Sequence, residues 1–157
     1  MPGMVATAES LRALAELVDA LEAPEAVFGT WVPSSPRPDG SASMPYVEYG
    51  ELEGRLRAAV GRGGWMRVGF DWSSWAATDE ARAFEADPAR IAAATPEQLA
   101  RLLTWIIRGD RFSEGTLLGA FERGHLAAIA RRAQALLDDP VALAASMAED
   151  AGRADPG

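Results

Sequence analysis

The sequence contains no cysteine, no lysine and only one histidine, His125. Without cysteine there can be no disulfide, no thiolate catalysis and no cysteine metal site, and a reducing compartment is the default. A lone histidine argues against zinc, although scattered carboxylates leave magnesium open. We therefore predict no metal and no cofactor. The sequence also lacks a Walker motif and a Rossmann fingerprint.

Long hydrophobic runs are also missing. The longest apolar run near a predicted helix covers residues 102–107 and is broken by Thr104, whereas a membrane span needs about 20 apolar residues. Residues 1–9 lack the basic and apolar regions of a signal peptide. We expect a cytoplasmic chain with one helical domain over residues 1–150 and a disordered tail over 151–157. The arginine-only basic residues and abundant alanine indicate a GC-rich bacterial genome.

The net charge of −8 disfavours nucleic acid and anionic membranes as partners, because both bind basic surfaces. Helical spacing of apolar residues instead dominates the chain. It predicts a mainly α fold, a compact bundle of about six helices with an irregular aromatic-rich segment and at most a short strand pair. Helices are expected over residues 8–22, 51–62, 78–86, 96–109, 114–123 and 125–137, with a weaker one from Pro140.

Several local signals set the expected helix ends. Thr95 and Gln98 form a capping box before the helix that ends near Gly109, and the apolar circumference of that helix places it at the centre of the fold. Ser113 is expected to cap the helix over 114–123. Residues 29–45, rich in proline and glycine, are predicted to form a mobile loop or a lid, followed by a short extended piece over 46–49.

Aromatic residues gather in the irregular segment, at Trp65, Phe70, Trp72 and Trp75. They could form a satellite core or a platform on which a base or sugar stacks. We take Trp72 as a candidate binding residue. Asp71, between two aromatic residues, is not explained by packing alone.

Polar residues gather in the turns around the 114–123 helix, namely Asp110, Arg111, Glu114, Glu122 and His125. These are the other candidate binding residues, and two interpretations stay open. They could form a pocket in which Arg111 binds a carboxylate or phosphate bidentately, or an ion-paired network that joins three helices. In the network, Arg111 would pair with Glu114 or Glu122 behind the shield of Phe112.

His125 and two glycines of this region also leave alternatives open. His125 stands at a predicted helix start, where it could act as a neutral base or make capping contacts. Gly115 and Gly119 lie one helical turn apart, and each costs about 1 kcal/mol relative to alanine inside a helix. Such a cost indicates that another helix or a ligand comes close.

No complete catalytic set is present, so we predict no catalytic residues and a small binding or interaction domain. Its recognition surface would lie around residues 110–125, and its partner would be an unknown protein or a small anionic ligand. An alternative is an enzyme with Glu114 or Glu122 as acid or base beside Arg111. A second alternative is a DNA-binding helix-turn-helix through residues 125–137, with Arg131 and Arg132 on phosphates.

Three motifs stand in a recognisable order: Phe70-Asp71-Trp72, Asp110-Arg111-Phe112-Ser113-Glu114-Gly115 and Phe121-Glu122-x-Gly124. With them the chain resembles an uncharacterised bacterial family, the domain of unknown function 6508, over about residues 28–137. The resemblance implies no known activity. In that family a histidine often follows the glycine of the second motif, and Thr116 stands there in this chain, which weakens that position as a base or metal ligand.

Overall fold

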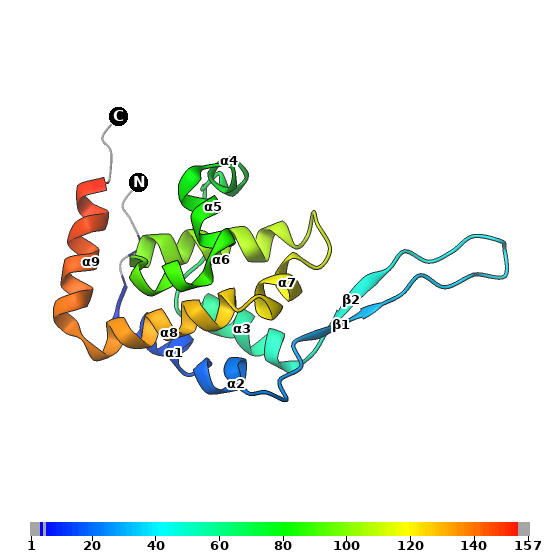
Figure 1. Ribbon diagram of the computed structural model, residues 1–157, viewed down its shortest axis with the longest axis horizontal. Coiled ribbons are helices and arrows are strands. Elements are labelled where there is room, and N and C mark those ends of the chain that lie inside the picture. The colour runs from blue at the N-terminus through cyan, green and yellow to red at the C-terminus, as the bar shows by residue number, and fades with distance from the viewer. Residues whose placement is uncertain (1–3, 5, 154–157) are drawn as a thin grey trace.

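A computed structural model describes Met4 and residues 6–153 of the chain (Figure 1). Within that part there are nine α-helices, one 3₁₀ helix and a short antiparallel pair of strands. The order is α1 (Ala8–Ala15), α2 (Val18–Glu22), β1 (Gly29–Val32), β2 (Tyr46–Tyr49), α3 (Glu51–Arg62), α4 (Trp72–Ala76), α5 (Asp79–Ala86), η1 (Pro88–Ala93), α6 (Pro96–Gly109), α7 (Thr116–Glu122), α8 (His125–Asp138) and α9 (Pro140–Arg153). The mainly α fold and the strand pair are confirmed.

The helices outnumber the six expected for two local reasons. The predicted helix over 8–22 breaks between α1 and α2, although Leu14, Leu17 and Leu21 are all buried, as on one face of a single helix. In the segment predicted to be irregular, Asp71 caps the short helix α4 by accepting a hydrogen bond from the Ser74 N–H at 3.0 Å. A capping carboxylate stabilises the first turn of a helix.

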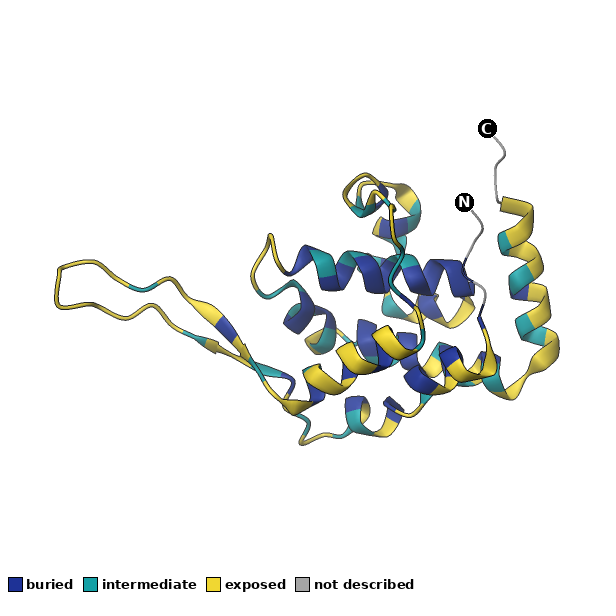
Figure 2. Cartoon of the chain, turned by 180° about the vertical axis from the view of Figure 1, so that it is seen from behind, coloured by how far each residue is buried: buried dark blue, intermediate teal, exposed yellow. Residues whose placement is uncertain are grey.

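The core is built around α6, as predicted. Leu99, Leu102 and Leu103 are fully buried, and Figure 2 shows buried residues along most of this helix. The predicted capping box starts it, since Thr95 accepts from the Gln98 N–H at 3.2 Å and Gln98 accepts from the Thr95 N–H at 2.9 Å. The other central helix is α8, which packs against α1, η1, α2, α7 and α9.

Residues 29–45 differ from the predicted loop. Residues 29–32 form β1 and pair with β2 in the register Gly29↔Tyr49 to Val32↔Tyr46. Beyond the strands the two branches stay together, with Ser43 N–H donating to the Ser35 carbonyl at 2.8 Å. We call residues 29–49 the arm, because Figure 1 shows them projecting from the helical body. The proline and serine content of this segment predicted a loop, because the pairing of β1 with β2 joins residues up to 20 positions apart and local patterns do not reveal it. Its mobility stays a prediction.

The predicted disordered tail over 151–157 is wrong for its first three residues. Residues 151–153 continue α9 rather than starting a disordered tail, while 154–157 lie outside the described residues. Among the helices that the structure describes, none combines the length and the apolar character needed to cross a membrane.

Candidate functional site

Four of the six predicted site residues divide between two places, and the first is the base of the arm. The Asp110 side chain, 9% exposed, follows the last turn of α6. Its Oδ1 atom accepts hydrogen bonds from the Tyr49 hydroxyl at 2.8 Å and from the Leu117 N–H at 3.0 Å. The Asp110 carboxylate thus links β2 and the C-terminal end of α6 to the first turn of α7.

Glu114 and Gly115 hold the same base. Glu114 Oε1 accepts from the Val47 N–H of β2 at 2.8 Å. Gly115 has φ +89°, and a Cβ atom there would overlap the indole ring of Trp31 in β1. Only glycine combines that backbone conformation with so close an approach. We call Asp110, Glu114 and Gly115 the arm joint, because all three contact the arm.

Two predictions for this loop are wrong. Ser113 does not cap the next helix with its side chain; its carbonyl instead accepts from the Thr116 N–H at 3.2 Å and the Thr116 hydroxyl at 2.8 Å, and α7 begins at Thr116. Arg111 makes no ion pair with Glu114 or with any other described residue. The Arg111 side chain is exposed to solvent. Phe112, itself 80% exposed, does not shield it.

We therefore expect Arg111→Ala to change stability little, by less than about 0.5 kcal/mol, as for other exposed side chains without partners. The sequence alone predicts a drop of several degrees in Tm. Thermal unfolding followed by circular dichroism distinguishes the two, with Arg62→Ala at the exposed end of α3 as the control. If Arg111→Ala lowers Tm well beyond the control, Arg111 does take part in an ion-paired network in solution.

The structure gives the two alternative functions little support. Glu122 is exposed and, like Arg111 and Glu114, lies outside the four main pockets of the described part of the chain. Arg131 pairs with Glu22 at 2.5 Å, and Arg132 donates to the Ala94 carbonyl at 2.8 Å. Both guanidinium groups that would contact DNA phosphates are thus engaged within the protein.

The second place is a pocket of about 380 Å³ between α4, α6 and α7. Two of the six candidates, Trp72 and His125, line it, together with Trp105 and Phe112. The rings of Trp72 and Phe112 lie 5.9 Å apart with a tilt of 32°. We call it the aromatic pocket.

Glycines form part of the lining of the aromatic pocket. A Cβ at Gly109 would lie 3.7 Å from Trp105 and 3.8 Å from Trp72, so this backbone lies between the two indoles. A Cβ at Gly119 would meet nothing within 4 Å. Packing explains Gly115 of the predicted glycine pair, but it does not explain Gly119, whose missing side chain leaves space in the pocket.

His125 is 3% exposed and lines the aromatic pocket. Its Nε2 atom lies 3.1 Å from the Phe84 carbonyl and 3.0 Å from the Glu85 carbonyl, in the last turn of α5. Carbonyls only accept, so Nε2 carries the proton. His125 therefore makes capping contacts, as one prediction had it, but with the C-terminus of α5. It stands at the start of α8, where the contact was expected. Its Nδ1 atom has no hydrogen-bond partner among the described residues.

The predicted aromatic cluster is divided. Trp65 is buried in the main core, and its indole N–H donates to the Ser10 carbonyl at 2.8 Å. Trp75 contacts Trp105 edge to face, with ring centroids 6.1 Å apart. Helix capping explains why an aspartate stands between two aromatic residues at position 71. Its carboxylate accepts hydrogen bonds from the Ser74 N–H and hydroxyl, and these bonds hold the pKa of that carboxyl below its usual value.

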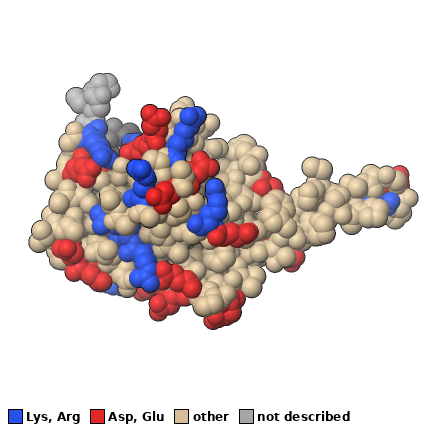
Figure 3. All heavy atoms as spheres, in the orientation of Figure 1, with Lys and Arg blue, Asp and Glu red and all other residues tan. Residues whose placement is uncertain are grey.

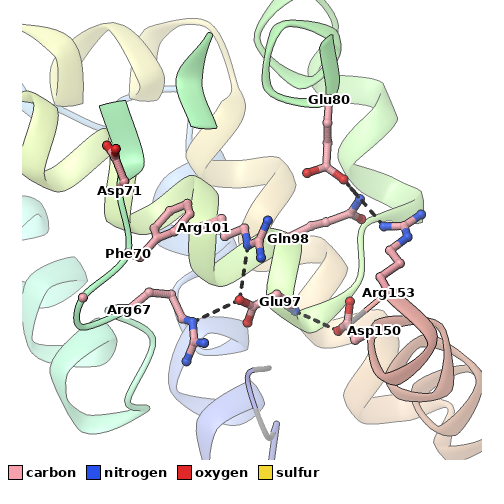
Figure 4. Close-up of a pocket in the computed structure, with 10 residues that line it drawn as sticks. Arg67, Phe70, Asp71, Glu80, Glu97, Gln98, Arg101, Asp150 and Arg153 are labelled. Atoms are coloured by element: carbon pink, nitrogen blue, oxygen red, sulfur yellow. Dashed lines mark hydrogen bonds and ion pairs between the residues drawn. The ribbon is translucent and has the colours of Figure 1, made fainter. Parts of the chain in front are cut away.

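A third site was missed by the sequence interpretation (Figure 4). It is a pocket of about 260 Å³ in which charged side chains of α5, α6, α9 and the segment before α4 meet. Its charged and polar lining residues are Arg67, Asp71, Glu80, Glu97, Gln98, Arg101, Asp150 and Arg153. We call it the charged pocket. These residues are spread over 87 positions of the chain, from 67 to 153, so no local motif could join them.

Glu97 organises the charged pocket. This buried carboxylate accepts from Arg67 Nε at 3.1 Å and Arg101 Nε at 3.2 Å. Its own backbone N–H donates to Asp150 at 3.0 Å, which joins α9 to the start of α6. In Figure 3 arginines and acidic residues alternate over the body, while the arm is nearly uncharged until its tip. No group of acidic residues or histidine in the described part of the chain is arranged to hold a metal ion.

Comparison with known proteins is informative only at the level of the family. No curated protein and no solved structure matches the chain. A family model matches residues 6–139, and its description is a family of unknown function, DUF6508. That match covers the core helices, the arm and both pockets apart from the α9 side of the charged pocket. The chain therefore belongs to the DUF6508 family.

Proposed function

We propose that this domain is a cytoplasmic bacterial binding module whose recognition site is the aromatic pocket. The observation that carries the proposal is the lining of that pocket, in which Trp72, Trp105 and Phe112 occur together with three glycines, Gly109, Gly115 and Gly119. Aromatic walls with few polar groups are typical of sites for small organic molecules. The lack of cysteine supports a reducing compartment.

The ligand that fits best is a small molecule with a flat ring. Indole faces bind planar groups by stacking, and the missing side chain of Gly119 leaves room for such a ring in the pocket. His125 supports a ring with an N–H or O–H group, since its unpartnered Nδ1 is an acceptor when Nε2 holds the proton.

Filling the pocket tests the proposal without harming the fold. Gly119→Leu places a side chain in empty space and replaces a poor helix former, so its Tm should equal or exceed that of the wild type. Glu122→Leu is the matched control, because it puts the same side chain on the same helix outside the pocket. Saturation-transfer NMR with indole, adenosine, uridine and benzoate should detect at least one ring bound to the wild type.

We expect that signal to disappear in Gly119→Leu, to persist in Glu122→Leu and to weaken in Trp72→Ala. Failure of every ring to bind the wild type would reject the aromatic pocket as the recognition site. Equal binding by Gly119→Leu would also reject it, since the ligand would then lie elsewhere.

A further inference from the structure

We infer that the charged pocket binds a small zwitterion, a molecule with a carboxylate at one end and an ammonium group at the other. The inference is independent of the proposed function, because the charged and aromatic pockets share no lining residue. It starts from the way charge is divided within the charged pocket (Figure 4).

One end of the charged pocket holds two guanidinium groups, those of Arg67 and Arg101. Both contact the Glu97 carboxylate through Nε. The other end is mainly acidic. Arg153 lies 3.6 Å from Glu80 and also bonds to Glu149. Glu80 accepts from Gln98 Nε2 at 2.6 Å and from Trp75 Nε1 at 2.8 Å as well, so Asp150 is the carboxylate there with an acceptor to spare. Figure 4 shows the two ends on opposite sides of Glu97 and Gln98, with the Asp71 carboxylate directed away from Arg101.

Arg101 is oriented for a carboxylate. Its guanidinium carbon lies 5.2 Å from the centroid of the Phe70 ring, and its Nε is held by Glu97. Its two terminal nitrogens donate to no other residue in the described part of the chain. A guanidinium fixed on one edge and on one face presents those nitrogens as a fork, which is the geometry that binds a carboxylate bidentately.

Asp150 supplies an acceptor at the other end. Its Oδ2 atom accepts from the Glu97 N–H at 3.0 Å, and its Oδ1 atom has no partner among the described residues. Arg101 and Asp150 do not pair with each other across the pocket. They are linked through one residue, Glu97, whose side chain contacts Arg101 and whose backbone contacts Asp150. A ligand about as long as one or two residues can therefore reach both.

A simple anion would use only the Arg101 end, and a simple cation only the Asp150 and Glu80 end. A zwitterion satisfies both ends and adds no net charge to an acidic protein. Free amino acids, ω-amino acids and dipeptides are the class of ligand that this arrangement fits.

The experiment is isothermal titration calorimetry of the full chain with a series of probes: glycine, β-alanine, 4-aminobutanoate and 6-aminohexanoate. Each is compared with the acid that lacks the amino group: acetate, propanoate, butanoate and hexanoate. The spacer length that binds best measures the distance between the two ends. We expect at least one amino acid of the series to bind about tenfold or more tightly than its partner acid, as an added charged hydrogen bond predicts.

Two variants assign the ends. Arg101→Gln should weaken the best probe about ten- to a hundredfold, while Arg90→Gln, an exposed arginine of η1 outside the charged pocket, should leave it unchanged. Asp150→Asn should instead reduce the preference for the amino form, which a merely structural role would not change. If Arg101→Gln fails to fold, Arg101→Lys keeps the charge without the fork and should still weaken binding.

The inference is overturned if no amino acid of the series binds the wild type, if the simple acids bind as tightly, or if binding survives Arg101→Gln. None of these outcomes depends on the aromatic pocket, so the two proposals fail separately.

Discussion

Gly115→Ala should lower the stability of the domain by about 2–4 kcal/mol. A residue with a Cβ pays about 1–2 kcal/mol in the left-handed region, where Gly115 lies at φ +89°. The new methyl group would also overlap the Trp31 indole, and overpacking of this kind costs about 1–3 kcal/mol. For a chain of this length Tm should fall by about 5–15 °C, which calorimetry can measure.

Gly119→Ala is the control one helical turn away, and its effect should have the opposite sign. Its Cβ would meet nothing within 4 Å inside α7, so it should gain up to about 1 kcal/mol of helix propensity. Adding Trp31→Ala to Gly115→Ala should recover the steric part and leave the backbone cost. If Gly115→Ala is as stable as the wild type, Trp31 does not pack on this glycine in solution.

Asp110→Ala should cost about 2–4 kcal/mol. It removes the acceptor for the Tyr49 hydroxyl and for the buried Leu117 N–H, and hydrogen bonds to a charged group contribute about 1.5–3 kcal/mol each. Urea unfolding gives the free-energy change. Glu48→Ala, on the exposed side of β2, is the matched control and should change little.

The same contact predicts a dependence on pH. Burial, and then the hydrogen bond to the Asp110 carboxylate, raise the pKa of Tyr49 above its usual value. The folded state therefore favours the neutral phenol, and this contribution is complete below pH about 10, the pKa of an unperturbed tyrosine. It is lost as pH rises above about 10. Tyr49→Phe should lose less stability than the wild type between pH 9 and 11, and an identical loss would contradict the bond to Asp110.

Much of the fold could be predicted because its signals are local. The capping box at Thr95, the break between the helices over 114–123 and 125–137, and the apolar circumference of α6 each involve residues within a few positions, and each is confirmed. Of the arm, the extended piece over 46–49 was predicted, but its partner strand over 29–32 was not located, because the two pair across a stretch rich in proline and serine. Strand pairing over such a distance depends on tertiary contacts, here with the loop after α6.

The candidate site was predicted only in part, because some of its contacts are made across distant parts of the chain. Trp72 and His125 do lie in one pocket, but Asp110 and Glu114 bind the arm, whose fold the sequence did not show. Arg111 was expected to reach Glu114 in the first turn of the next helix, or Glu122 beyond it. The helix begins only at Thr116, so Glu114 lies in the loop before it and accepts from Val47 instead.

Gln98 illustrates what a local signal leaves out. Its side chain completes the capping box, as predicted, yet its Nε2 also donates to Glu80 at 2.6 Å in the charged pocket. A capping motif in the sequence identifies the first partner and is silent on the second. The charged pocket therefore became visible only when α5, α6 and α9 were placed together.

The hydrogen bond from Val47 to Glu114 has a consequence for the behaviour of the protein at high concentration. A two-stranded ribbon has two open edges, and open edges recruit strands from neighbouring molecules into aggregates. Glu114 occupies the outward N–H of β2 near the body. Further out, Pro33, Pro36 and Pro45 have no N–H to offer. The arm can thus project into solvent with few free donors along its edges, which should let the protein expose it without growing into an intermolecular sheet.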